Sequence, residues 1–185
     1  PKVIYGAVVA MMVLSMAMLP NIQIDTDPEN MLAENTPARV THNKVKKDFN
    51  MYDMLFVGIV SDENVYVPET LTALHQLTTD VLNIKGVVDQ DLISLAVVDN
   101  IRQQANGGIR FEYLMKTAPK TLEASQNIQN AVSRLPMLQN TLVSEDNKAL
   151  GLYVPITSKE LSYDIAEKIR GLSAELPQSL KVYIT

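Results

Sequence analysis

The sequence predicts an α+β protein, in which a split β-α-β domain with an inserted segment follows one membrane-spanning helix. Three observations lead to this prediction. Residues 3–19 carry no charged side chain. Downstream, continuous apolar runs that suit buried strands alternate with stretches of helical periodicity. A strand-helix-strand order occurs twice, once on each side of residues 99–147.

The apolar segment defines the first region, a partial transmembrane helix over residues 1–20. Residues 3–19 would form a helix about 25 Å long, at the short end for a hydrocarbon core of about 30 Å. Lys2 precedes the segment and the acidic run Asp25–Glu29 follows it, so we expect residues after 20 to lie outside the cytoplasm. A signal peptide, with a cleavage-like Ser15-Met16-Ala17, and a buried core helix are the alternatives.

The second region, residues 21–52, is a polar, turn-rich lead-in in which we expect one helix over 38–49. The third region, residues 53–185, opens with the apolar run Met54–Val60, which is typical of a covered central strand. Pro68-Glu69 starts a helix, because proline suits the first helical position and an acid suits its positive end. Residues 87–98 then predict a second, interrupted strand.

Residues 99–147 form a predicted helical insertion, with a turn at Asn106–Gly108 and a helix over 119–135. The second strand-helix-strand unit follows it. Its parts are a strand over 149–156, a helix opened by a Thr157–Glu160 capping box, and a last strand over 180–184. Two such units form one sheet with helices on one face.

Aromatic and methionine side chains near the first strand and in the insertion are the candidate binding residues, because such clusters form adaptable binding surfaces. They are Phe49, Tyr52, Phe56, Phe111, Tyr113, Leu114 and Met115. The alternative is a small satellite core beneath a long insertion. Residues 107–118 are favoured because long insertions in compact domains are often functional.

Other chemistry finds little support. The net charge of −5 argues against nucleic acid as a partner, and the absence of cysteine excludes disulfides and thiolate metal sites. Asp25–Glu29 has the spacing of calcium-loop ligands, but Asn30 and Thr36 replace the required glycine and glutamate. His42 and His75 are 33 residues apart, and no nucleophile or phosphate-loop motif occurs. We expect no enzyme, metal or cofactor; copper export through the nine methionines is a minor alternative.

Five segments resemble, in the same order, the first transmembrane helix and first external loop of the resistance-nodulation-division (RND) superfamily. After the apolar helix they are IDTDPENMLAENTPAR at 24–39, DMLFVGIV at 53–60, VPETL at 67–71, IKGVVDQDLISLAVVDNI at 84–101 and LVSEDNKALGLYVPI at 142–156. The match is to the lipid-exporting branch, which includes the large mycobacterial membrane proteins (MMPL), hopanoid transporters and Patched. That family's acidic proton-relay residues lie in a helix outside this sequence.

This resemblance implies a ferredoxin-like porter domain in the periplasm, part of a proton-driven exporter in the bacterial inner membrane. Its implied partners are the lipid bilayer, a hydrophobic or lipidic substrate, and the remaining transmembrane and second periplasmic domains of the same protein. A homo-oligomer is a further option. Two other readings stay open: an extracytoplasmic sensor or ligand-binding module anchored by a single helix, and a secreted ligand-binding domain behind a signal peptide.

Overall fold

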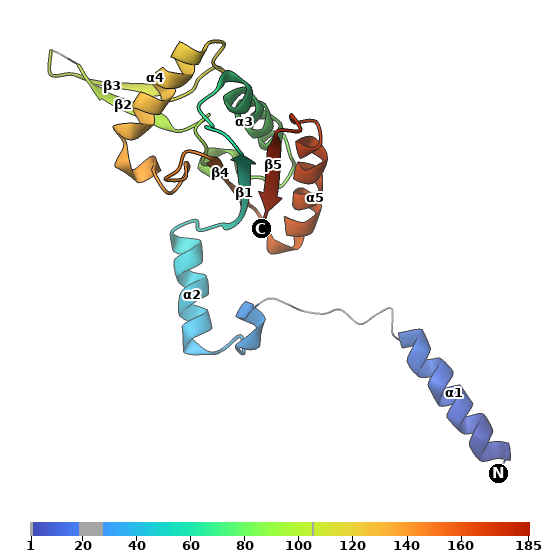
Figure 1. Cartoon of the computed structure of the whole chain (residues 1–185). Coiled ribbons are helices and arrows are strands. Elements are labelled where there is room, and N and C mark those ends of the chain that lie inside the picture. Colours follow the sequence, from blue (N-terminus) through green and yellow to red (C-terminus); the bar gives the residue numbers. More distant parts are fainter. Residues whose placement is uncertain (1, 19–27, 105) are drawn as a thin grey trace. The chain divides into compact units, whose positions relative to one another are not determined.

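A computed structural model describes residues 2–18, 28–104 and 106–185. The chain forms two compact units that divide between Met51 and Tyr52 (Figure 1). Across the described residues, five α-helices combine with two small antiparallel sheets. The α+β class is therefore confirmed.

The first unit contains α1 (Lys2–Met18), the short 3-10 helix η2 (Pro28–Met31) and α2 (Pro37–Asp48). The large apolar side chains of α1 are exposed. Within the described part of the chain, no helix combines the length and the apolar character needed to cross a membrane. The predicted acidic positions Asp25 and Asp27 lie outside the described residues.

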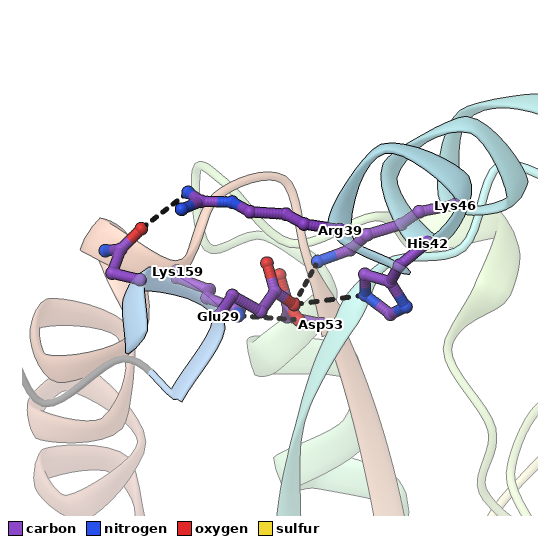
Figure 2. Close-up of polar contacts among 7 residues, drawn as sticks. Glu29, Arg39, His42, Lys46, Asp53 and Lys159 are labelled. Carbon is purple, nitrogen blue, oxygen red and sulfur yellow. Dashed lines mark hydrogen bonds and ion pairs between the residues drawn. The ribbon is translucent and has the colours of Figure 1, made fainter. Parts of the chain in front are cut away.

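Polar contacts hold α2 against η2, and α2 itself buries no residue. Figure 2 shows the Glu29 carboxylate between His42 and Lys46, with N–O distances of 3.2 and 3.6 Å. Arg39 donates to the carbonyl of Leu32 at 2.6 Å and to the side-chain oxygen of Asn30 at 2.7 Å. This unit is therefore organised by charge and hydrogen bonding and lacks an apolar core of its own among the described residues.

The second unit is built on a sheet of three strands in the order β4-β1-β5. The central strand β1 (Asp53–Ser61) runs antiparallel to β4 (Ala149–Ile156) and to β5 (Leu180–Ile184). Strands were predicted within a residue of these bounds. Strand β1 is covered on both edges and on one face, so it contains a continuous run of apolar residues. That run is what predicted the strand from the sequence.

Two helices, α3 (Pro68–Leu82) and α5 (Ser162–Ser173), lie side by side on one face of this sheet (Figure 1). Pro68 occupies the first turn of α3, as the sequence predicts. Leu74 of α3 and Ile169 of α5 are completely buried against the sheet residues Val57 and Ile59. Each such side chain contributes about 1.5–3 kcal/mol on burial, so this layer supplies the core of the unit.

As predicted, the second strand over 87–98 is interrupted, and it forms no continuous strand. Only two isolated bridges form, Val87 with Ile156 and Ile93 with Tyr153, both antiparallel to β4. Between them the chain turns through the 3-10 helix η3 (Asp89–Asp91). Aspartate is disfavoured in strands because its side chain bonds nearby backbone groups, as Asp89 does with the amide of Gln90 at 2.9 Å.

The insertion is only partly helical. It begins with a hairpin of β2 (Asp99–Gln103) and β3 (Ile109–Tyr113), which the sequence did not predict. Helix α4 (Leu122–Ser133) follows, and the 3-10 helix η4 (Pro136–Leu138) comes next. The start of α4 is later than predicted, because the Thr121 hydroxyl accepts the Ala124 amide at 3.2 Å and caps the helix there.

The predicted Thr157–Glu160 capping box is also wrong. The Ser158 hydroxyl contacts Glu160, and the Thr157 amide donates to the carbonyl of Gly86 at 2.9 Å. A 3-10 turn, η5 (Lys159–Leu161), therefore precedes α5. The Thr157 amide is thus held by a residue far away in the sequence, and no side chain caps η5.

Candidate functional site

The hairpin of β2 and β3 presents one apolar face to solvent. Its register pairs Ile101 with Phe111, Gln103 with Ile109 and Asp99 with Tyr113, so these side chains share one face. Ile101 is 53% exposed, Ile109 65%, Phe111 67% and Tyr113 55%. Four exposed apolar side chains on so small a sheet form a surface that is typical of contact with another molecule.

The opposite face of the hairpin is polar. Glu112 lies between Arg102 at 3.4 Å and Arg110 at 3.2 Å, and both arginines are exposed. The side chain of Asn100 is buried and donates to Glu112 at 3.3 Å. The hairpin is thus an amphipathic ribbon whose charged face stays hydrated while its apolar face is free to bind. These exposed ion pairs add little stability by themselves.

Leu114 and Met115 follow β3 directly and fasten the hairpin to the core. They are 7% and 2% exposed, so neither is available on the surface as the other candidates are. The Leu114 amide donates to the carbonyl of Val98 at 2.9 Å, which closes the base of the ribbon. The structure therefore divides residues 111–115 into exposed contact positions and buried anchors.

Two surface hollows flank this base. One, of about 440 Å³, is lined by Tyr113, Lys116 and the apolar side chains of Leu82 and Leu92, among others. The second, of about 530 Å³, is lined by Leu114, Met115, Lys116 and residues of α4. Both volumes fall in the range of about 300–1,000 Å³ that small-molecule sites occupy. The hairpin and its hollows together are the candidate functional site.

The other predicted candidates lie elsewhere. Phe56 is half-buried on the sheet face opposite the helices, where its ring packs on Tyr153 with centroids 4.9 Å apart. Tyr52 is 36% exposed at the start of the second unit, while Phe49 is 74% exposed and belongs to the first. The structure brings Phe111 and Tyr113 together, and Phe56 belongs to a different surface.

The histidines have structural partners. His42 pairs with Glu29, and the Nε2 atom of His75 lies 3.3 Å from the carbonyl oxygen of Lys116. Among the described residues, no three His, Cys, Asp or Glu side chains are grouped as a metal site would need. Glu29, one of the three acidic positions with calcium-loop spacing, instead forms ion pairs with His42 and Lys46.

Ile101 and Ile109 belong to the exposed apolar face, and the sequence analysis did not name them as candidates. The signal was present, because Ile109-Arg-Phe-Glu-Tyr113 alternates apolar and charged residues with the period of a strand. The run lies within residues 99–147, which the sequence analysis treats as a helical insertion because they break the strand-helix pattern. The apolar side of this run faces solvent and packs on no core, so it is a candidate contact surface.

Comparison with models of known protein families gives no match for this chain, and comparison with curated proteins gives none.

Proposed function

We propose that this chain is the first part of a proton-driven exporter of the RND superfamily, from its lipid-exporting MMPL, hopanoid-transporter and Patched-like branch. In this proposal the second unit is a porter domain that contacts hydrophobic or lipidic substrates. The observation that carries the proposal is the exposed apolar face formed by Ile101, Ile109, Phe111 and Tyr113. The proposed role is non-enzymatic and needs no cofactor.

A ferredoxin-like architecture is part of the proposal. In such a fold the two β-α-β units interleave, so that the first strand lies between the third and fourth strands, and the second pairs with the third. The order β4-β1-β5 has this pattern, and residues 87–93 contact the other edge of β4 through two bridges. On this reading, Val87–Ile93 is a reduced second strand.

Membrane attachment through α1 completes the proposal. The helix is uncharged after Lys2 and its apolar side chains are exposed. Flanking residues would extend it to the length of a span, with Lys2 on the cytoplasmic side and the second unit in the periplasm. The rest of the transporter, including the second periplasmic domain and the proton-relay residues, would be supplied by chain outside this sequence.

The chemistry of the hairpin suits reversible lipid contact. Burial of each of its four apolar side chains would contribute on the order of 1–2 kcal/mol. A gross gain of roughly 4–8 kcal/mol is reduced by the loss of motional freedom on binding, so the contact is weak enough to release cargo. A substrate shifts a conformational equilibrium only by its difference in affinity for the two states, and an export cycle requires such a difference.

A transport assay tests this function. The complete protein that carries this chain is reconstituted in vesicles, and transfer of a fluorescent phospholipid to acceptor vesicles is followed with and without a proton gradient. We expect transfer to need the gradient and to fall severalfold in Phe111→Ser. Tyr163→Ser, which removes an equally exposed aromatic ring from α5, serves as the matched control and should keep full transfer. Transfer that ignores the gradient would overturn the proposal.

The alternative, a single-helix-anchored sensor or ligand-binding module, also agrees with one apolar helix ahead of one folded unit. The two functions differ in the complete reading frame. An exporter requires about a dozen apolar spans and a second large external loop, whereas a sensor requires one or two spans.

A further inference from the structure

A second concave site lies in the same unit, outside the hairpin and its hollows. It is a cavity of about 260 Å³ enclosed by four short segments. These are the loop before α3, the last turns of α4, the loop after η4 and the turn before β4. Its volume falls just below the range of about 300–1,000 Å³ found for larger ligands, and suits a single ring or a short chain.

Tyr66 contributes a phenol to the lining of this cavity. The residue is only 4% exposed and lines the cavity, and its backbone amide is held by Asn64 at 2.8 Å. No hydrogen bond joins its hydroxyl to another described residue, and no fully buried side-chain oxygen among these residues lacks a partner, so the hydroxyl is accessible to solvent. Burial alone raises the pKa of Tyr66 to about 12, so the hydroxyl is a neutral donor at physiological pH. A ligand in the cavity would replace the water that this accessible hydroxyl otherwise meets.

The remaining polar lining is almost entirely neutral. Four amide side chains, none with a side-chain hydrogen bond among the described contacts, contribute to it: Gln129, Gln139, Asn140 and Asn147. Glu145 is the one charged lining residue, and it is exposed. The lining includes no lysine or arginine. Donors and acceptors are therefore plentiful, while the charge that would attract a phosphate or a carboxylate is missing.

We propose that this cavity binds a neutral polyhydroxylated group, such as a sugar ring or a polyol. Each hydroxyl of such a group both donates and accepts, which matches amide side chains and a phenol. The ring of Tyr66 and the buried side chain of Val143 offer the apolar surface on which a sugar's C–H groups rest. An anion would meet the Glu145 carboxylate with no basic side chain in the lining to balance it, and an apolar ligand would leave the amides unpaired.

The proposal does not depend on export. A free sugar and the headgroup of a glycolipid present the same chemistry, and the cavity is separate from the hairpin residues proposed to contact lipid tails. Failure of the transport assay would not contradict the sugar-site proposal. Failure of sugar binding would not contradict the proposal that the hairpin contacts lipid.

Saturation-transfer NMR on the full chain in detergent tests the site. The probes are glucose, myo-inositol and methyl glucoside, with inorganic phosphate and choline as charged comparators. We expect saturable binding of at least one neutral probe and none of the charged ones. Tyr66→Phe keeps the ring and should weaken binding about three- to tenfold, the loss of one hydrogen bond. Gln129→Met should act similarly without touching the core, and Tyr163→Phe, at an exposed site, should change nothing.

Octyl glucoside distinguishes a free sugar from a glycolipid headgroup as the natural ligand. It is used below its critical micelle concentration, with the protein in a detergent that has no sugar headgroup. Tighter binding than methyl glucoside supports a glycolipid headgroup, and equal binding supports a free sugar. Three results would overturn the proposal: no saturable binding of any neutral probe, stronger binding of phosphate or choline, or unchanged binding in both Tyr66→Phe and Gln129→Met. Circular dichroism of both variants shows whether each remains folded.

Discussion

At the scale of single residues, buried hydroxyls connect α3 to the chain that leads into the insertion. Thr78 donates to the carbonyl of Leu74 at 2.7 Å, and its oxygen lies 2.9 Å from that of Ser94. Ser94 is fully buried and also accepts the amide of Ala96 at 3.0 Å. Because a buried polar group without a partner is costly, these contacts fix the path of the segment that carries the hairpin.

Thr78→Val removes one partner of this pair and should lower the free energy of unfolding by about 1–3 kcal/mol. Thr79→Val is the matched control, because its hydroxyl bonds the carbonyl of His75 at 2.8 Å in the same way but is exposed. Urea unfolding followed by circular dichroism measures both. Equal effects of the two substitutions would show that the contact with Ser94 contributes nothing.

Asp146 shapes the turn before β4. Hydrogen bonds from the Ser144 hydroxyl, first, and from the Lys148 amide lower the pKa of Asp146 below its ordinary value of 3.8. Because this pKa is lower in the folded protein than in the unfolded chain, the carboxylate stabilises the turn at pH values above its unfolded-state pKa. This stabilisation is lost as the pH falls through its folded-state pKa. Ser144→Ala should therefore raise the pKa of Asp146, as read by NMR titration of its carboxyl carbon. A pKa that does not move would contradict this account.

At the scale of elements, Gly86 lies where the chain packs closely against Leu161 and against Ile165 of α5, just before residues 87–93 bridge to β4. Gly86 has φ +101°, and a Cβ atom there would lie 2.8 Å from Leu161 and 3.3 Å from Ile165. Gly107, in the hairpin turn, also has positive φ, at +84°, but no atom lies within 4 Å of the corresponding position. The two glycines therefore share backbone strain and differ only in crowding.

Gly86→Ala should destabilise the protein by roughly 2–3 kcal/mol, from left-handed strain plus a small overpacking cost, because the atoms that a Cβ would meet are methyl ends of flexible side chains. Gly107→Ala should cost about 1–2 kcal/mol, from the strain alone. Thermal unfolding of the two variants beside the parent gives the comparison. If Gly107→Ala proves as damaging as Gly86→Ala, the predicted clash with α5 does not operate.

The elements also show what a sequence can predict. Strands β1, β4 and β5 and helix α3 follow from local signals, because each has a continuous apolar run or a periodic stripe that the core buries. The two bridges of residues 87–98 and the backbone contact before α5 involve distant partners, including Gly86 for the Thr157 amide, and local sequence signals do not specify such partners. In the candidate site, the apolar alternation at 109–113 was readable, but the burial of Leu114 and Met115 depends on tertiary contacts.

At the scale of the whole molecule, the core lies entirely within the second unit. The buried apolar cluster runs from Leu55 to Leu180 and includes no residue of the first unit's described part. The stability of the second unit should therefore come from its own packing. The first unit, with its exposed apolar helix and its charged α2, is suited to a tether.

A fragment of residues 52–185 should accordingly unfold cooperatively, with a free energy of unfolding within about 1 kcal/mol of that of the full chain in detergent. Urea titration of both species by circular dichroism gives the comparison, and gel filtration reports the oligomeric state. A molten or aggregating fragment would show that the first unit is needed for folding.

We propose that the apolar face of the hairpin contacts lipid. A photo-cross-linking residue placed at Phe111, with the protein in native membranes, tests this claim directly, and the same residue at Tyr163 provides the control because that position is similarly exposed on α5. Mass spectrometry then identifies what is attached. The account predicts lipid adducts at position 111 well in excess of those at 163. Equal labelling at the two positions, or no lipid at 111, would contradict it.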